Sequence, residues 1–133
     1  MAIQPFFGKE ERTESEIRLS KGPVLSLKWT DWIWKAFLLD GSDRDHPASN
    51  VFRPKVGLDI PGLKFPTTIV AVGGFDPLQD RQRSYYEELK RSGKEVKMVE
   101  YPNAIHAFYA FPMLTESSLV IEDMKDFMEK QLA

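Results

Sequence analysis

The sequence contains no cysteine, no long apolar run and no large excess of either charge. Without cysteine there is no disulfide framework, no thiolate site for zinc and no cysteine nucleophile. No stretch approaches the 18 consecutive apolar residues of a membrane-spanning helix. The 18 basic and 20 acidic side chains leave a net charge of −2, whereas a nucleic acid or an anionic membrane would require a basic patch. We therefore expect neither a nucleic-acid partner nor a membrane partner.

Residues 1–7 have no basic segment and too short an apolar run for a signal peptide, so a cytoplasmic location is expected. The length of 133 residues suffices for one domain, and the hydrophobic share of 42% is that of a globular protein. Gly73 and Gly74 are not followed by the Lys-Ser/Thr pair of a P-loop. No cofactor is therefore expected.

Strand and helix patterns alternate along the chain. The β-branched, continuously apolar run at residues 67–72 is typical of a strand covered on both faces in a parallel sheet. The alternation predicts βαβ units, so the expected fold class is α/β, with three mostly parallel strands and flanking helices. Strands are predicted at 2–7, 67–73 and 95–101, and helices over part of 8–20 and over 32–39, 78–92 and 118–131. The segment 8–20 is rich in charged side chains and is expected to be exposed.

The helix predicted at 32–39 has residues that suit both of its ends. Thr30 or Asp31 is expected to cap its N-terminus, and Gly41 is expected to end it. Apolar residues at i, i+3 and i+4 predict one wide buried face. Gly93 is expected at the C′ position of the helix predicted at 78–92.

A polar loop begins at Gly41 and contains several oxygen-bearing side chains. A calcium loop counted from Asp43 would need Gly at its sixth position and a bidentate Glu at its twelfth. The sixth position is not Gly and the twelfth is Pro54, so the loop does not fit calcium binding. Asp43, Asp45 and Asn50 are expected to be turn residues instead. No metal site is expected.

Asp76 follows the end of the strand predicted at 67–73. Open α/β sheets place ligands and catalytic groups at the carboxyl ends of their strands. As an alternative, Asp76 caps the N-terminus of the next helix, with Pro77 near the first helical position. Both interpretations fit the residues.

His106 lies in a loop after the strand predicted at 95–101. A lone loop histidine is more often a surface or packing residue, yet an acid followed by a histidine is the order of the last two members of a hydrolase triad. A carboxylate on one imidazole nitrogen orients the ring as a general base. Neighbouring strands are about 5 Å apart, so we expect Asp76 and His106 to meet within hydrogen-bond distance as catalytic residues.

The first member of such a triad has no counterpart in the sequence. No Gly-x-Ser-x-Gly motif and no His-Gly-Gly stretch occurs among the 133 residues. None of the serines follows a strand-to-helix elbow pattern. The residues therefore indicate a hydrolase without its nucleophile, and the apolar start at residues 2–7 is a hint of an upstream part.

Several segments resemble a known family. Residues 73–82 resemble the segment that carries the catalytic acid in hormone-sensitive-lipase-like α/β-hydrolases (α/β-hydrolase fold-3), and residues 100–108 resemble the segment with the catalytic histidine. Residues 3–8 resemble the strand after the nucleophile helix, and residues 43–50 the loop before the acid strand. The combination is most similar to plant carboxylesterases, the group that also contains the gibberellin receptor.

The resemblance implies an eight-stranded, mostly parallel sheet with an N-terminal cap, a His-Gly-Gly oxyanion loop and a Gly-Asp-Ser-Ala-Gly elbow. Residues 1–133 match only the last three strands, which implies the C-terminal portion of a single catalytic domain, a truncated fragment without the nucleophile half. By position, Asp76 matches the catalytic acid and His106 the catalytic base. The implied function is a serine-type carboxylic-ester hydrolase, whose full-length form acts on a small-molecule ester without a cofactor.

The alternative function is a non-catalytic small-molecule binding or interaction module related to the gibberellin receptor. The resemblance implies that receptor members have lost the triad histidine, so His106 favours the hydrolase. A relative with the same triad is a dehydratase, so the triad alone does not determine the reaction. The chain alone is expected to be inactive, because the elbow and the oxyanion loop are absent. It is also expected to be poorly stable, because its first strand leaves an apolar edge unpaired.

Overall fold

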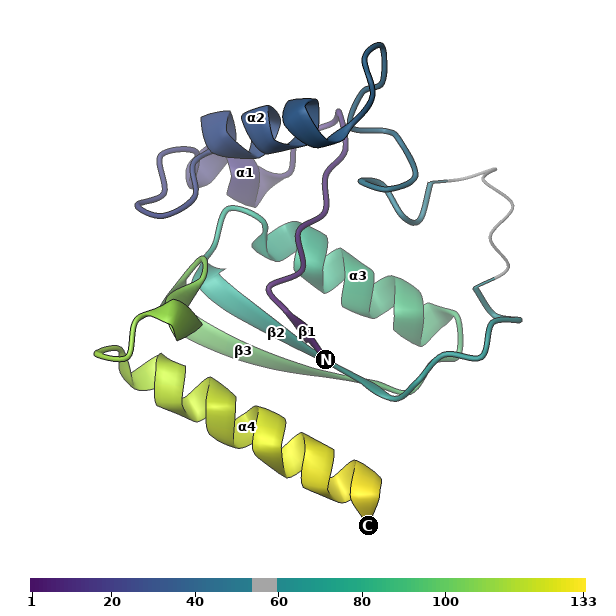
Figure 1. Cartoon of the computed structure of the whole chain (residues 1–133), viewed down its shortest axis with the longest axis vertical. Coiled ribbons are helices and arrows are strands. Elements are labelled where there is room, and N and C mark those ends of the chain that lie inside the picture. The colour runs from purple at the N-terminus through teal and green to yellow at the C-terminus, as the bar shows by residue number, and fades with distance from the viewer. Residues whose placement is uncertain (54–59) are drawn as a thin grey trace.

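A computed structural model describes residues 1–53 and 60–133 and shows a parallel sheet with helices around it (Figure 1). Pro54, used above in judging the polar loop, lies outside the described residues. The elements in chain order are β1 (Ala2–Ile3), α1 (Glu14–Arg18), α2 (Leu27–Phe37), β2 (Thr68–Phe75), α3 (Gln79–Arg91), β3 (Val96–Ile105), the 3₁₀ helix η1 (Phe108–Ala110) and α4 (Thr115–Leu132).

The predicted α/β class with parallel strands and flanking helices is confirmed. The strand order is β1-β2-β3, and both pairings are parallel. Residues 68–73 of the central strand β2 are all buried, as a strand with covered faces requires. Figure 1 shows α3 on one side of the sheet and α4 on the other, with α1 and α2 in a further layer beyond α3. No helix of the described ranges is both long enough and apolar enough to cross a bilayer.

The central strand ends at Phe75 instead of residue 73, and two other predicted strand ends are wrong by four residues each. The first strand ends at Ile3 instead of residue 7, because Gln4 takes a left-handed conformation with φ of 43° and turns the chain away. The third strand does not stop before Pro102 but continues to Ile105. Proline, which cannot donate to a strand ladder, is tolerated here because β3 is an edge strand of this sheet and is bulged at this point.

The predicted start of the second helix is wrong by five residues. Ser26 is the N-cap of α2, and its side chain accepts a hydrogen bond from the Trp29 N–H. Thr30 lies inside the helix, where its hydroxyl donates to the Leu27 carbonyl. The helix ends at Phe37, before Gly41 is reached.

The wide buried face predicted for this helix is also wrong. Only Thr30 and Trp34 are buried on α2, while Trp32 is 60% and Phe37 68% exposed. The apolar spacing therefore did not show which side chains face the protein.

The charged segment 8–20, predicted to be exposed, is partly buried. Thr13 and Glu16 form a capping box at the start of α1. The Glu16 carboxylate is 2% exposed and pairs with Arg81 of α3 at 2.9 Å and with Arg12 at 3.7 Å. A buried carboxylate needs such partners, and the pair with Arg81 attaches α1 to α3.

The last two helices agree with the prediction to within one residue at their C-terminal ends. Gly93 follows α3 with φ of 73° and donates to the Lys90 carbonyl, as expected at C′. The predicted helix 118–131 is observed as the longer α4.

The hydrophobic core lies between the sheet and α4. The Tyr101 hydroxyl meets the Asp123 carboxylate at 2.5 Å, and burial followed by this hydrogen bond raises the pKa of Tyr101. Phe108 is fully buried in the same cluster and packs on the Tyr101 ring at 5.1 Å. The buried members are Ile69, Ala71, Tyr101, Ala104, Phe108, Val120 and Met124.

We predict that Phe108→Ala destabilises the chain far more than Tyr109→Ala. Phe108 is fully buried while its neighbour Tyr109 is 44% exposed. Removal of a buried phenyl ring costs about 3–5 kcal/mol, and the surface substitution should cost less than about 1 kcal/mol. Urea unfolding followed by tryptophan fluorescence measures both, and equal losses would contradict this description of the core.

Candidate active site

The sheet changes register at the point where β2 and β3 approach their ends. From Thr68 to Gly73 each residue of β2 pairs with the residue 28 positions later in β3, whereas Phe75 pairs with Ile105, 30 positions later. Two extra residues of β3 are therefore accommodated in a bulge. With the earlier offset of 28, Asp76 would have stood opposite Ala104. The bulge brings His106 to that place instead.

Glycine at position 74 is required by this bulge. A Cβ atom there would lie 2.1 Å from the Pro102 carbonyl oxygen, well inside van der Waals contact. The two backbones can therefore come this close only where a side chain is missing.

Asp76 is fully buried, and its carboxylate accepts three hydrogen bonds. Oδ1 accepts from the Leu78 N–H at 2.8 Å. Oδ2 accepts from Gln82 Nε2 at 2.8 Å and lies 2.8 Å from His106 Nδ1. Burial of a carboxyl group is costly unless such donors replace the lost water.

The Asp76–His106 distance predicted from the sequence is confirmed by the 2.8 Å contact. The capping alternative is wrong in its strict form, because Leu78 is the N-cap of α3 and makes no side-chain cap bond. Asp76 does bind the Leu78 N–H, so one oxygen shapes the turn before the helix while the other faces the imidazole.

His106 presents its Nδ1 to the Asp76 carboxylate. Within the described residues, no hydrogen bond reaches Nε2, and the side chain is 16% exposed. The Phe6 ring lies edge-on to the imidazole, with centroids 6.2 Å apart. Trp34 packs behind Phe6 at 5.6 Å. The imidazole is thus held on its Asp76 side and open at Nε2.

Three residues that support the acid loop escaped the sequence analysis. Gln82 is fully buried on α3, and Gln79 donates to the Gly74 carbonyl at 2.7 Å. The Ser15 hydroxyl of α1 donates to the Pro77 carbonyl at 2.8 Å. Gln79 and Gln82 stand near the start of an expected helix after a candidate acid, which is the one sequence signal that could have identified them.

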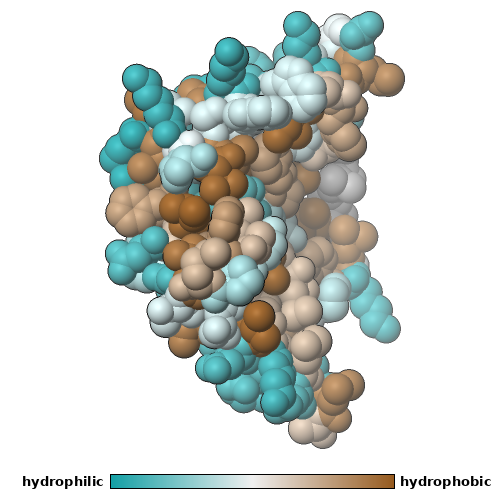
Figure 2. Space-filling view, turned by 60° about the vertical axis from the view of Figure 1, so that its left-hand side comes forward, coloured by the Kyte–Doolittle hydropathy of each residue, from teal (hydrophilic) through white to brown (hydrophobic). Residues whose placement is uncertain are grey.

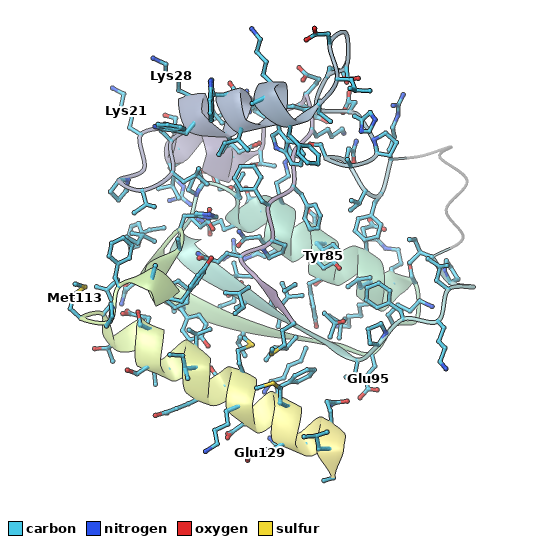
Figure 3. The ribbon with its side chains drawn as sticks, viewed as in Figure 1. Lys21, Lys28, Tyr85, Glu95, Met113 and Glu129 are labelled. Atoms are coloured by element: carbon cyan, nitrogen blue, oxygen red, sulfur yellow. The ribbon has the colours of Figure 1, made fainter. Side chains whose placement is uncertain are left out.

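The surface around this edge of the sheet is largely apolar. Figure 2 looks at the side that is on the left in Figure 1 and shows apolar side chains across its middle, with hydrophilic groups above and below. Phe75 at the end of β2 is 47% exposed and Tyr109 of η1 is 44% exposed. Met113, 79% exposed, lies at the outer edge of the loop between η1 and α4 (Figure 3).

An aromatic side chain of α3 packs against the segment that follows β1. Tyr85, labelled in Figure 3, contacts the rings of Phe7 and Phe52 at 4.7 and 5.7 Å. Burial raises the pKa of Tyr85. These contacts hold the segment after β1 against α3.

A cavity of about 370 Å³ lies away from the Asp76–His106 pair. It is lined by Trp34 together with charged groups, and neither Asp76 nor His106 lines it. Hydrogen bonds from Arg44 at its rim lower the pKa of Glu10 to about 2. Because neither residue of the Asp76–His106 pair lines this space, we place the candidate active site at the sheet edge.

The polar loop makes turns, as predicted for Asp43. Its carboxylate accepts from the Asp45 N–H at 2.9 Å. Asp45 also lies in a turn, and its carboxylate accepts from the Glu10 N–H at 3.3 Å and from the Asn50 amide at 3.4 Å. Over residues 1–53 and 60–133, no three His, Cys, Asp or Glu side chains gather into a group that could hold a metal ion.

Comparisons with known proteins identify the family and the fold of the chain. A family profile described as alpha/beta hydrolase fold matches residues 1–110. Gibberellin receptor GID1A of Arabidopsis thaliana is 39% identical over 129 residues, which are 97% of this chain and 37% of that protein. Probable carboxylesterase 8 of the same plant is 34% identical over 127 residues, which are 95% of this chain and 38% of that protein.

A solved structure of the hyperthermophilic esterase from the archaeon Pyrobaculum calidifontis has the same fold. It matches with a TM-score of 0.84 at 24% identity, over 98% of this chain and 42% of that chain. The chain spans little more than a third of the length of the curated relatives it matches.

We predict that Gly74→Ala disturbs the bulge and destabilises the chain by about 1–3 kcal/mol, the usual cost of forcing extra atoms into a packed site. Asn103→Ala is the matched control, since Asn103 lies in the same bulge with an exposed side chain and should cost less than about 0.5 kcal/mol. Urea unfolding compares the two variants. If Gly74→Ala is as stable as the control, the close approach to Pro102 is not a constraint.

Proposed function

The chain belongs to the carboxylesterase-like alpha/beta hydrolase fold family, and we propose that it carries the acid and the base of a serine-type carboxylic-ester hydrolase. The observation that carries the proposal is the 2.8 Å contact between Asp76 Oδ2 and His106 Nδ1, with Nε2 left open. A carboxylate on one nitrogen and a free second nitrogen is the arrangement of a general base in acyl transfer.

Each group has a defined role in the proposed reaction. The serine hydroxyl attacks the ester carbonyl, and His106 Nε2 takes the proton of that hydroxyl. The proton then passes to the departing alcohol, and the acyl group stays on the serine. His106 next takes a proton from water, the hydroxide attacks the acyl-enzyme, and the acid is released while the proton returns to the serine. Asp76 holds the Nδ1–H tautomer and stabilises the imidazolium.

We propose that residues 1–133 are the C-terminal part of one catalytic domain and that the serine comes from a part outside them. The chain matches little more than a third of its relatives. The sheet order also supports this. In the described residues β1 pairs only with β2, so its other edge has backbone N–H and C=O groups that a further strand could pair with. The substrate in the complete enzyme is proposed to be a small-molecule ester.

A second candidate function is non-catalytic binding of a small molecule, as in the gibberellin receptors. The identity to those receptors favours it, since it reaches 37–40% over at least 95% of this chain. The intact Asp76–His106 pair favours the hydrolase, because binding alone needs no oriented base.

A chimera tests the two candidates. Residues 1–133 replace the matching C-terminal segment of probable carboxylesterase 8, and hydrolysis of 4-nitrophenyl esters is measured. We expect activity that falls by about 10³-fold or more in His106→Ala and in Asp76→Asn, since each residue belongs to a unit that acts together.

His46→Ala is the matched control, because His46 lies in the polar loop, where its Nδ1 accepts from the Ala48 N–H, and its loss should leave the rate unchanged. A folded chimera that hydrolyses no ester but binds gibberellin in calorimetry would support the receptor-like function. Equal activity in the wild-type and His106→Ala chimeras would also contradict the hydrolase proposal.

The isolated chain is predicted to hydrolyse no 4-nitrophenyl acetate above background. Without a nucleophile the covalent route is missing, and without oxyanion donors the rate falls by about a further 10²–10³-fold. Clear turnover by the purified chain that disappears in His106→Ala would reveal a nucleophile within these 133 residues.

A further inference from the structure

Gln4 joins the two backbone groups on either side of His106. Its side-chain Nε2 donates to the Ile105 carbonyl at 3.0 Å. Its Oε1 accepts from the Ala107 N–H at 2.7 Å. Gln4 is 3% exposed, and the bonded residues lie 101 and 103 positions away in sequence. One amide group therefore spans the residue that carries the imidazole.

The Gln4 side chain starts from a fixed place in the sheet. Its own N–H donates to the Ala71 carbonyl of β2 at 2.9 Å, directly after the pairing of Ile3 with Ala71. The left-handed φ of 43° at Gln4 turns the chain away directly after β1. Conformations of this kind persist in non-glycine residues only when the surroundings hold them.

Space for the amide is provided by Gly73. A Cβ atom at position 73 would lie 2.6 Å from Gln4 Nε2 and 2.7 Å from the Ala104 carbonyl oxygen. The amide thus crosses β2 at a residue without a side chain and reaches the end of β3. The two glycines therefore make room for different groups. The missing Cβ at Gly74 lets the Pro102 carbonyl approach in the bulge, and the missing Cβ at Gly73 leaves space for the Gln4 amide.

The backbone of Ala107 has a conformation that is unfavourable for a residue other than glycine. Its φ is 57°, a left-handed conformation in a residue that is not glycine, and it leads into η1. The hydrogen bond to Gln4 falls on this residue. The backbone at 106–107 is thereby held in a conformation that a free loop would leave.

We propose that Gln4 is a positioning residue for His106, fixing the backbone on both sides of the imidazole so that Nδ1 faces Asp76 and Nε2 stays open. This inference rests on the proposed function for its meaning, but not for its test. Gln4 touches no reacting atom, and its effect passes through the loop. Loss of the amide removes its hydrogen bonds to the Ile105 carbonyl and the Ala107 N–H, which weakens the hold on the loop.

The test reads the imidazole directly by ¹⁵N NMR of histidine-labelled protein at neutral pH. The chain has two histidines, and the structure gives them opposite tautomers. His46 Nδ1 accepts from the Ala48 N–H, so its proton is on Nε2. His106 Nδ1 faces a carboxylate, so its proton is on Nδ1. His46 is thus an internal reference that does not depend on Gln4.

Gln4→Met keeps the side-chain volume and removes both hydrogen bonds. We expect the His106 Nδ1–H signal to exchange with water about tenfold faster or more, the factor that corresponds to the loss of one or two hydrogen bonds, with the His46 signals unchanged. Thr68→Val is the matched control. It removes the buried hydroxyl that donates to the Pro66 carbonyl at 2.9 Å, at the far end of β2, and should leave His106 unchanged.

A purely structural role predicts a different result. If Gln4→Met lowers the unfolding free energy but leaves the His106 signals as in the wild type, the proposal is overturned. If Gln4→Met does not fold, Gln4→Asn is read in the same way, since its amide is one methylene too short to reach both groups. In wild-type protein, a Gln4 side-chain amide that exchanges as fast as that of the exposed Gln131 would also overturn it. None of these readouts requires ester hydrolysis.

Discussion

The approach of β2 to β3 at Gly74 is the constraint on which the rest of the site depends. The strands pair at an offset of 28 up to Gly73 and at 30 from Phe75 onward. That change is possible because the Pro102 carbonyl can lie against a backbone without a Cβ atom. It moves the end of β3 by two residues, so that the first residues after the two strands are an acid and a histidine. A uniform ladder would have placed an alanine there.

Hydrogen bonding then holds the acid loop in one arrangement. A carboxylate buried from water is costly unless it is paired, and here the pairing is supplied by the turn at Leu78, by Gln82 and by His106. The loop around the imidazole is held by Gln4 in the same way. The site is therefore rigid at its base and open at one imidazole nitrogen, which suits a group that accepts and returns a proton.

The sequence alone predicted the parts of this structure that depend on local pattern. The run at 67–72 identified the central strand, and the positions of Asp76 and His106 after two strands predicted their meeting. The bulge was not predictable, because it depends on which backbone lies against Gly74, a contact between strands. The α1 segment was misjudged for a similar reason, since the burial of Glu16 depends on distant partners such as Arg81.

The most direct test of the central claim is active-site labelling of the native protein with a fluorophosphonate, followed by mass spectrometry. The account predicts a label on a single serine within a polypeptide that also contains the peptides of these 133 residues, and that His106→Ala abolishes the labelling. A native polypeptide that contains these peptides and takes up no label, although it is folded, would contradict the assignment of Asp76 and His106 to a hydrolase.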